Sequence, residues 1–158
     1  MKKVITIGRE FGSGGREIGR RIAEKLQIAY YDQEIVTEIA KRTKLSEEYV
    51  ERITEDRPYM AYPIHAGMSF HTSYYAYTEF DRSLTVVAEQ HNIIKELADK
   101  SDCIIVGRCA DYILKEKDPF RIFVYADAES KLKRCRERSP EDENLSDSKI
   151  RRNIRSID

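Results

Sequence analysis

The sequence predicts an α/β protein whose parallel sheet is covered by helices on both faces. Short apolar runs, typical of buried strands, alternate along the chain with segments whose apolar residues recur at helical spacing. The first apolar run is followed by a glycine-rich loop that opens a helix. Ligands bind at the carboxyl ends of the strands in such folds, so functional residues are expected there.

The elements are predicted from these patterns. The strands are the short apolar runs at residues 4–7, 28–31, 103–106 and 121–125, the last two being of the fully buried type. The helices are residues 16–26, 33–42, 46–54, 81–100, 129–138 and 147–157, with Ser46 as the N-cap of the third. The first two strands and the helix between them form a βαβ unit.

Length and charge limit what the protein binds. The 158 residues predict a single domain, and 28 basic residues balance 28 acidic ones. This balance provides no overall field to attract a nucleic acid polymer or a membrane, so small-molecule partners are expected, with a homodimer left open. Three cysteines without metal-ligand spacing (Cys103, Cys109 and Cys135), and the lack of a signal peptide or membrane-spanning run, indicate a cytoplasmic protein.

The glycine-rich loop is the strongest functional signal. The predicted phosphate-binding residues are Gly12, Ser13, Gly14, Gly15, Arg16 and Glu17. Glycine adopts the positive φ angles that turn successive backbone N–H groups inward, and we expect such angles at Gly12, Gly14 and Gly15. The helix that follows adds the positive end of its dipole at the same point.

The loop departs from the phosphate-binding signature G-x-x-x-x-G-K-[ST]. In one register Gly15 replaces the lysine, Arg16 replaces the Mg²⁺-binding hydroxyl, and Arg9 replaces the first glycine. In the other, Arg16 is the phosphate cation and Glu17 stands at the metal-side position. Arginine suits the cationic role because its guanidinium binds phosphate oxygens in pairs. The alternative is a plain turn with Arg16 in solvent.

Asp32 raises a different alternative, a dinucleotide-binding loop. It lies twenty residues after Gly12, at the end of the second predicted strand, where a ribose-binding carboxylate would lie. The pattern G-x-G-x-x-G fails at Glu17, however, and Gly12 comes five residues after the strand instead of directly after it. The long loop therefore favours phosphate binding.

Charged residues also follow the later strands. Arg108 follows the third strand and Asp127 the fourth, so a parallel sheet would gather Arg16, Asp32 and Arg108 along one edge. Arg108 is predicted to contact an anion. The alternative is an ion pair of Arg108 with Asp111 or Asp127.

Residues 131–155 predict a basic hairpin whose cations flank an acidic turn. Arg134 and Arg138 share one helical face, from which they would offset charge on a phosphoryl group in transfer. A solvated charged face explains the same pattern. Aromatic residues gather between 56 and 80, which predicts either an acceptor site or the packing of a subdomain or dimer contact.

These segments resemble the cytidylate kinase-like P-loop proteins, relatives of bacterial cytidylate kinases and other nucleoside monophosphate kinases. The resemblance is carried by ITIGREFGSGGREIGRRIAEKL, YYDQEI, IIVGRCADYIL and RIFVYADAESKLKRCRER. It implies a P-loop kinase-type three-layer α/β/α fold with a helical acceptor-binding insert at about 33–100 and an arginine-rich lid at about 131–155. It also implies ATP and Mg²⁺ as cofactors and phosphate transfer to a nucleoside monophosphate or other small acceptor.

The resemblance assigns expected roles to individual residues. The expected catalytic residues are Arg16, Arg108, Arg134 and Arg138. Asp32 and Arg108 fall on the acceptor side, and Glu17 and Asp32 are the metal-side carboxylates. The family's usual loop lysine and hydroxyl are missing, so the alternative is a nucleotide-binding regulatory module without turnover. The family's next strand and helix do not follow the lid, which implies a truncated chain or an incomplete donor base site.

Overall fold

The computed structural model describes residues 2–55 and 70–138, with side chains described for 2–55 and 78–137. Its four strands form a parallel sheet in the order β2-β3-β1-β4. The strands are β1 (Val4–Arg9), β2 (Ala29–Tyr31), β3 (Cys103–Val106) and β4 (Phe120–Val124). The helices are α1 (Gly15–Leu26), α2 (Gln33–Thr43), α3 (Glu47–Glu55), α4 (Phe70–Lys100), α5 (Ala110–Ile113) and α6 (Ala128–Arg138), with a 3-10 turn, η1, at Lys115–Lys117.

The predicted strands and helices within the described residues are present. The helix predicted at 81–100 is the second part of the longer α4, and the N-cap role of Ser46 is confirmed, because its Oγ accepts the Tyr49 N–H at 3.2 Å. Helix α5 and the turn η1 were not predicted, because they are too short to show a helical period. The predicted helix at 147–157, most of the aromatic segment and the turn of the basic hairpin lie outside the described residues.

The prediction of a fully buried strand at 121–125 is wrong. Within the described sheet β4 is an edge strand that pairs with β1 alone, and Phe120 and Phe123 are 68% and 65% exposed. The sequence pattern misleads because an apolar run looks the same whether one or both sides of its strand are covered.

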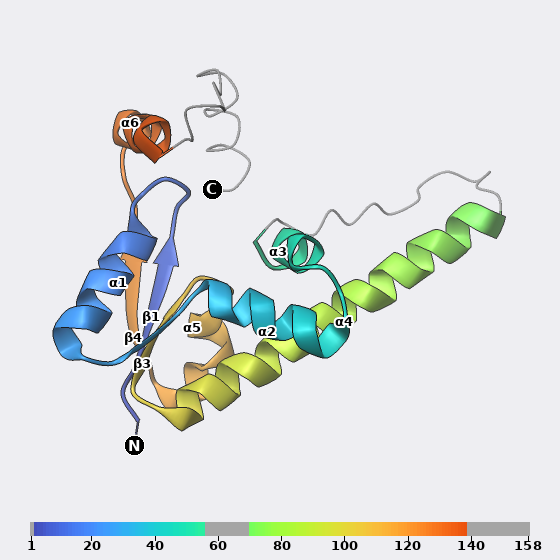
Figure 1. The fold of residues 1–158 in the computed structure, drawn as a ribbon, viewed down its shortest axis with the longest axis horizontal. Coiled ribbons are helices and arrows are strands. Elements are labelled where there is room, and N and C mark those ends of the chain that lie inside the picture. Colours follow the sequence, from blue (N-terminus) through green and yellow to red (C-terminus); the bar gives the residue numbers. More distant parts are fainter. Residues whose placement is uncertain (1, 56–69, 139–158) are drawn as a thin grey trace.

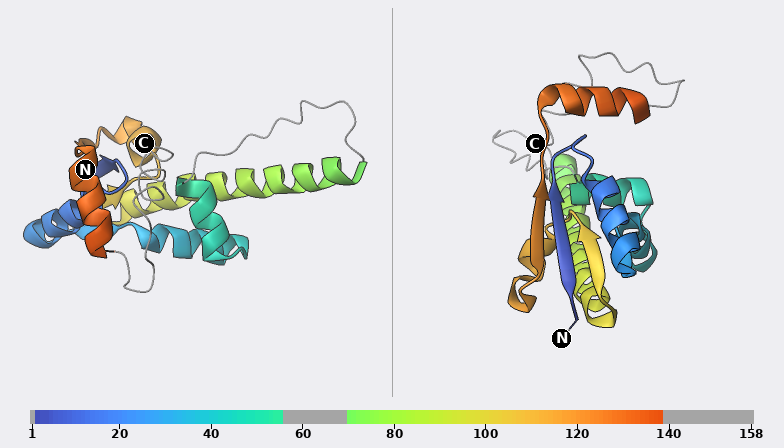
Figure 2. Two further views of the ribbon diagram at one scale, coloured as in Figure 1. Left: turned by 90° about the horizontal axis from the view of Figure 1, so that it is seen from above. Right: turned by 90° about the vertical axis from the view of Figure 1, so that its left-hand side faces the viewer.

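Helices cover both faces of the sheet, giving three layers (Figures 1 and 2). Side chains alternate along a strand, so Ile104 and Val106 of β3 pack toward α1, while Cys103 and Ile105 pack into the cluster formed with α2, α4 and α5. The cluster formed with α2, α4 and α5 is the larger of the two cores, and it includes Val50 of α3. Packing against this core holds α3 against α2 and α4.

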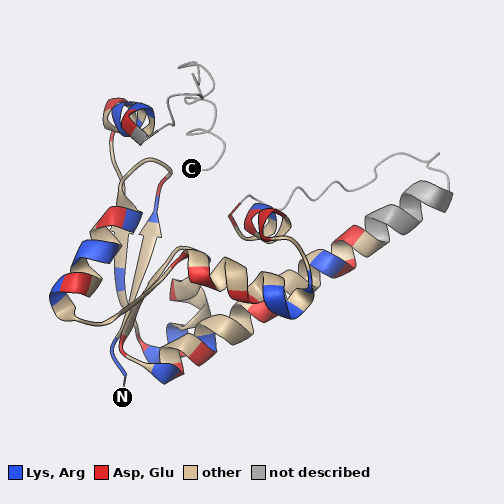
Figure 3. Cartoon of the chain, in the orientation of Figure 1, with Lys and Arg blue, Asp and Glu red and all other residues tan. Residues whose placement is uncertain are grey.

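The parallel strands bring three connections to one edge of the sheet. The loop after β1, the start of α2 after β2 and the turn after β3 all lie at the carboxyl ends, and α6 lies beyond the same ends (Figures 1 and 2). Acidic and basic residues are interspersed on the helices around this edge (Figure 3). Within the described ranges, none of the helices is long and apolar enough to cross a membrane.

Candidate functional site at the carboxyl edge of the sheet

The loop between β1 and α1 is a tight turn with two left-handed glycines. Gly12 has φ of 75° and Gly14 has φ of 90°, as predicted. Ser13 closes the turn, because its N–H and its hydroxyl both donate to the carbonyl oxygen of Glu10, at 3.2 and 2.8 Å. The expected positive φ at Gly15 is wrong. Gly15 is required for space instead, since a Cβ there would lie 2.7 Å from Cβ of Arg9.

Helix α6 packs directly on this loop. A Cβ on Gly14 would lie 2.9 Å from Cζ of Arg134, so the guanidinium of Arg134 lies against the loop backbone. Arg134 also reaches Glu17, with Nη1 3.4 Å from Oε2. The buried Nζ of Lys131 pairs with Oε2 of Glu10 at 2.8 Å and fixes the helix in place. The structure thus brings Arg134 to the loop, and its catalytic role stays a prediction. Arg138 ends α6, and its side chain lies outside the described residues.

The other side of the loop holds three arginines on one carboxylate oxygen. The Nη2 atoms of Arg9, Arg16 and Arg108 lie 3.1, 2.7 and 3.1 Å from Oε1 of Glu55. Nε of Arg16 lies 2.8 Å from Oδ2 of Asp32 as well. Arg16, Asp32 and Arg108 are therefore gathered as the sheet topology predicted, and Arg16 forms ion pairs with Asp32 and Glu55 although 43% of its side chain is exposed.

The backbone that presents Arg108 is left-handed over three successive residues. Gly107, Arg108 and Cys109 have φ of 71°, 55° and 53°, a conformation that is unfavourable for the two non-glycine residues. Nε2 of Gln90 donates to the Arg108 carbonyl oxygen at 3.1 Å, which helps to hold this turn. The turn directs the Arg108 side chain into the protein, where only 1% of it is exposed.

Arg108 is enclosed by the end of α3. Its Nη2 contacts Glu55, and its Nη1 donates to Oγ1 of Thr54 at 2.5 Å. Burial lowers the pKa of Arg108 from its ordinary value, while the nearby carboxylates of Glu55 and Asp32 oppose this shift. The expected alternative, a pair with Asp111 or Asp127, is not what the structure has.

Asp32 is buried at the start of α2 and has spare hydrogen-bonding capacity. Its side chain is 10% exposed, and within the described residues its Oδ1 has no hydrogen-bond partner. The Tyr30 hydroxyl lies 3.2 Å from the Arg16 carbonyl oxygen and 3.4 Å from Oδ2 of Asp32. Burial, together with the charge of Asp32, raises the pKa of Tyr30 to about 12, so the hydroxyl stays protonated at neutral pH.

The two predicted metal-side carboxylates differ in their surroundings. Glu17 pairs through Oε1 with Arg21 at 2.5 Å and through Oε2 with Arg134. Oδ1 of Asp32 has no hydrogen-bond partner within the described residues, so Asp32 is the carboxylate here that could hold a metal ion or a metal-bound water. Within the described part of the chain, His, Cys, Asp and Glu residues form no group of three that would hold a metal. Mg²⁺ in phosphotransferases is commonly bound by one or two carboxylates together with substrate phosphates. Asp32 could supply one such carboxylate at this edge.

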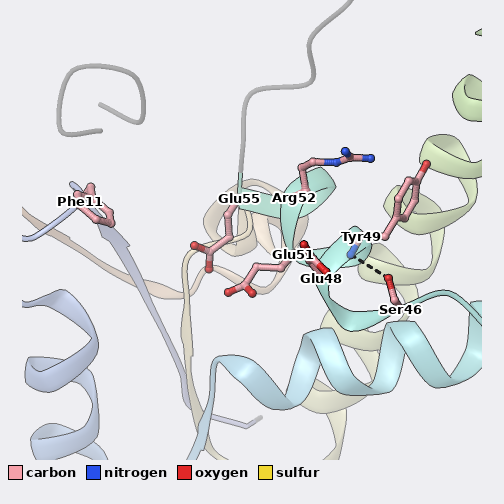
Figure 4. A pocket seen from close by; sticks show the side chains of 7 residues that line it. All are labelled: Phe11, Ser46, Glu48, Tyr49, Glu51, Arg52 and Glu55. Carbon is pink, nitrogen blue, oxygen red and sulfur yellow. Dashed lines mark hydrogen bonds between the residues drawn. The ribbon is translucent and has the colours of Figure 1, made fainter. Parts of the chain in front are cut away.

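A cavity of about 560 Å³ opens between the loop and α3. It is lined by Phe11, Ser46, Glu48, Tyr49, Glu51, Arg52 and Glu55. Figure 4 shows the carboxylates of Glu51 and Glu55 on the side of α3 that faces Phe11, with Arg52 and Tyr49 directed the other way. The cavity is large enough for a small molecule, and Glu55 links it to the arginine cluster.

Two residues of the cluster, Glu55 and Arg9, were not predicted from the sequence as functional residues. Arg9 carried one usable signal, because it comes two residues after the first apolar run and therefore lies at the carboxyl edge. Glu55 carried none, since a glutamate at the end of an amphipathic helix is ordinary.

The comparisons with known proteins agree with this geometry. The model of the cytidylate kinase-like family matches residues 4–158. The chain belongs to the cytidylate kinase-like family. Membership in this family supports a kinase-like function directed at a nucleotide or another small molecule. None of the curated proteins matches the chain in sequence.

Solved structures share the fold. An uncharacterized protein from Eubacterium ventriosum is 24% identical with a TM-score of 0.61, covering 98% of this chain and 70% of its own. Shikimate kinase from Acinetobacter baumannii, in complex with shikimate, is 15% identical with a TM-score of 0.52, covering 98% of this chain and 75% of its own. A Thermus thermophilus protein is 15% identical with a TM-score of 0.55, covering 99% and 81%. These likenesses confirm the P-loop kinase fold class.

Proposed function

We propose that this family member is an ATP-dependent, Mg²⁺-assisted phosphotransferase. It transfers the terminal phosphate of ATP to a nucleoside monophosphate or another small phosphorylated acceptor. The whole chain acts as one domain, with an acceptor-binding insert at about 33–100 and a lid at about 131–155. Family membership supports the reaction class, and the charge distribution at the carboxyl edge supports its assignment to this site.

The donor side of the proposed site is the loop and the start of α1. The residues Gly12, Ser13, Gly14 and Gly15 would wrap the phosphates of ATP, with the helix N-terminus behind them. Arg134 lies against Gly14, where it supplies a cation that the missing loop lysine would otherwise supply. Mg²⁺, held through Asp32 and more weakly through Glu17, would neutralise charge on the phosphates of ATP.

The acceptor side is the cluster of Arg108, Arg16 and Asp32 together with the adjacent cavity. Acceptors that already carry a phosphate need no general base, because a phosphate oxygen is nucleophilic without losing a proton to the protein. The protein's task is then to bring two anionic groups together and to offset the charge that develops.

One observation carries the proposal: arginines approach the loop from both sides. Arg134 comes from α6, while Arg9, Arg16 and Arg108 meet on the side of α3. Phosphoryl transfer relies on positioning and on offsetting negative charge, so this is the arrangement that the chemistry needs when the usual lysine is absent.

The test is a coupled assay of ADP release with a panel of nucleoside monophosphates. We expect turnover with at least one acceptor, and a loss of about a hundredfold in kcat for Arg16→Ala with partial retention in Arg16→Lys, which keeps a point charge. Arg121→Ala, on the exposed edge strand β4 and outside both the insert and the lid, is the control and should match the parent. Turnover that is indifferent to Arg16→Ala would contradict the role of Arg16.

The second candidate is a nucleotide-binding regulatory module without turnover. It is favoured by one observation, the replacement of both the lysine and the hydroxyl of the usual loop. ATP binding measured by calorimetry, with no ADP release across the whole acceptor panel, would select this candidate.

A further inference from the structure

Glu55 occupies a position that suits a bound anion. Its Oε1 is contacted by three guanidinium groups, an arrangement that arginines adopt around the oxygens of a phosphate. We propose that Arg9, Arg16 and Arg108 form a binding site for a dianionic phosphate group. Glu55 fills this site in the unliganded protein, and the phosphate of the acceptor enters by displacing Glu55.

The charges favour a dianion over a second carboxylate. Arg9, Arg16 and Arg108 are balanced by Glu55 and Asp32 within hydrogen-bonding distance. When Glu55 leaves, three cations and one carboxylate remain, an excess of two positive charges. A phosphate monoester near neutral pH carries close to two negative charges and offers three oxygens, one for each arginine.

Buried polar atoms in the cluster are left without partners. Nε of Arg108 and Oδ1 of Asp32 have no hydrogen-bond partner within the described residues, although the Arg108 side chain is 1% exposed and that of Asp32 is 10% exposed. Buried polar atoms of this kind are normally satisfied, and in the proposed site a bound phosphate or a water would supply the missing partners.

The cluster is reachable once Glu55 moves. Glu55 is 27% exposed and Arg16 is 43% exposed, and Glu55 lines the cavity shown in Figure 4. Arg108 lies behind Glu55 and Thr54. A ligand in the cavity can therefore reach Arg16 from solvent. It reaches Arg108, and the converging Nη2 atoms of all three arginines, only after the Glu55 carboxylate withdraws.

Arg9 lies between the phosphate loop and the turn after β3, so in the proposed function it would lie between ATP and the acceptor. Its Cβ packs against Gly15 of the loop, and its Nη1 would lie 3.2 Å from a Cβ on Gly107, after β3. The guanidinium thus spans the space between the phosphate loop and the acceptor edge. The assignment of the bound phosphate to the acceptor rests on the proposed function, whereas the site itself does not.

The site is tested by calorimetric titration with inorganic phosphate. Glu55→Gln removes the competing charge and should bind phosphate about tenfold more tightly than the parent, the equivalent of one charge-assisted contact. Glu47→Gln is the matched control, because it makes the same change on an exposed face of the same helix and should bind phosphate as the parent does. Arg9→Gln should weaken phosphate binding at least about tenfold.

Two results would overturn the site: a folded Glu55→Gln protein with parental affinity for phosphate, or an Arg9→Gln protein that binds phosphate as the parent does. Circular dichroism establishes folding. If Glu55→Gln does not fold, the Arg9→Gln comparison alone decides.

The source of the phosphate is tested separately. We expect Glu55→Gln to tighten binding of a nucleoside monophosphate more than binding of ATP, and the reverse order would overturn the acceptor assignment. Phosphate binding that follows the prediction in a protein without ADP release would refute the proposed function and leave the anion site standing.

Discussion

Glu55 shows how one carboxylate can hold three converging arginine side chains in order. Guanidinium groups that converge on one point repel each other, so their convergence is unfavourable without an anion between them. The Glu55 carboxylate offsets this repulsion, and Asp32 holds Arg16 through Nε. The arginines are thereby preorganised, which lowers the cost of ordering them when an anion binds.

Gly15 gives a prediction at the same scale. Gly15→Ala should lower the free energy of unfolding by about 1–3 kcal/mol, because its Cβ would overlap Cβ of Arg9 at 2.7 Å. Urea unfolding measures the effect. The double variant Arg9→Gly/Gly15→Ala tests the cause, since removal of Cβ from Arg9 should reduce the loss in free energy of unfolding that Gly15→Ala produces. Equal costs of Gly15→Ala in the two backgrounds would show that this contact is not the reason for a glycine.

At the scale of elements, α3 and α6 flank the loop. Helix α6 carries Arg134, which lies against the loop, and α3 carries Glu55, which pairs with the three arginines. Packing of Val50 into the core fixes α3, while the pair of Lys131 with Glu10 and the contact of Arg134 with Gly14 tie α6 to the loop. The start of α6 is also capped. Asp127 accepts the N–H groups of Glu129 and Ser130 at 3.0 and 2.8 Å.

The Asp127 cap predicts a pH dependence. Hydrogen bonds from the Ser130 hydroxyl and N–H lower the pKa of Asp127 below its ordinary 3.8. A lowered pKa in the folded state means that this cap stabilises the protein above about pH 4 and that the contribution is lost as pH falls through the folded value. Asp127→Ala should therefore lower the melting temperature at pH 7, and its difference from the parent should shrink in acid.

Asp81→Ala is the control for the Asp127 comparison, because Asp81 is exposed on α4. Its melting temperature should follow the parent at both pH values. A difference between Asp127→Ala and the parent that persists unchanged as the pH falls well below the ordinary pKa of 3.8 would contradict a charge-dependent cap.

At the scale of the whole molecule, the sheet and its two cores form the body, and α4 extends beyond it (Figures 1 and 2). The second part of α4 is buried through Gln90, Ile93, Ile94 and Ala98. Toward its start, Phe80 and Leu84 are 49% and 52% exposed. Stability is thus concentrated near the sheet, where the candidate site lies.

Hydrogen exchange should reveal this gradient. Amides of α4 at residues 90–98 should exchange slowly, close to the rate for β1 and β3, and those at 78–85 should exchange faster, because few buried contacts oppose local opening. Exchange measured by mass spectrometry checks the difference. Uniform protection along α4 would mean that the exposed apolar residues are covered in solution.

The amino-acid sequence determined the order of strands and helices, the position of the loop and the edge at which Arg16, Asp32 and Arg108 meet. These features follow from local patterns: apolar period, caps, glycines, and the rule that parallel strands end at one edge. Segment similarity also identified the family correctly. The roles assigned to individual residues stay predictions.

Only the tertiary structure decided which charges pair. Glu55 is separated from Arg9 by 46 residues and from Arg108 by 53, and no local pattern specifies such contacts. They arise because the core places α3 beside the loop and because three left-handed residues turn Arg108 inward. The exposure of β4 was likewise decided by its place at the sheet edge. Periodicity records which residues are apolar, whereas packing decides what covers them.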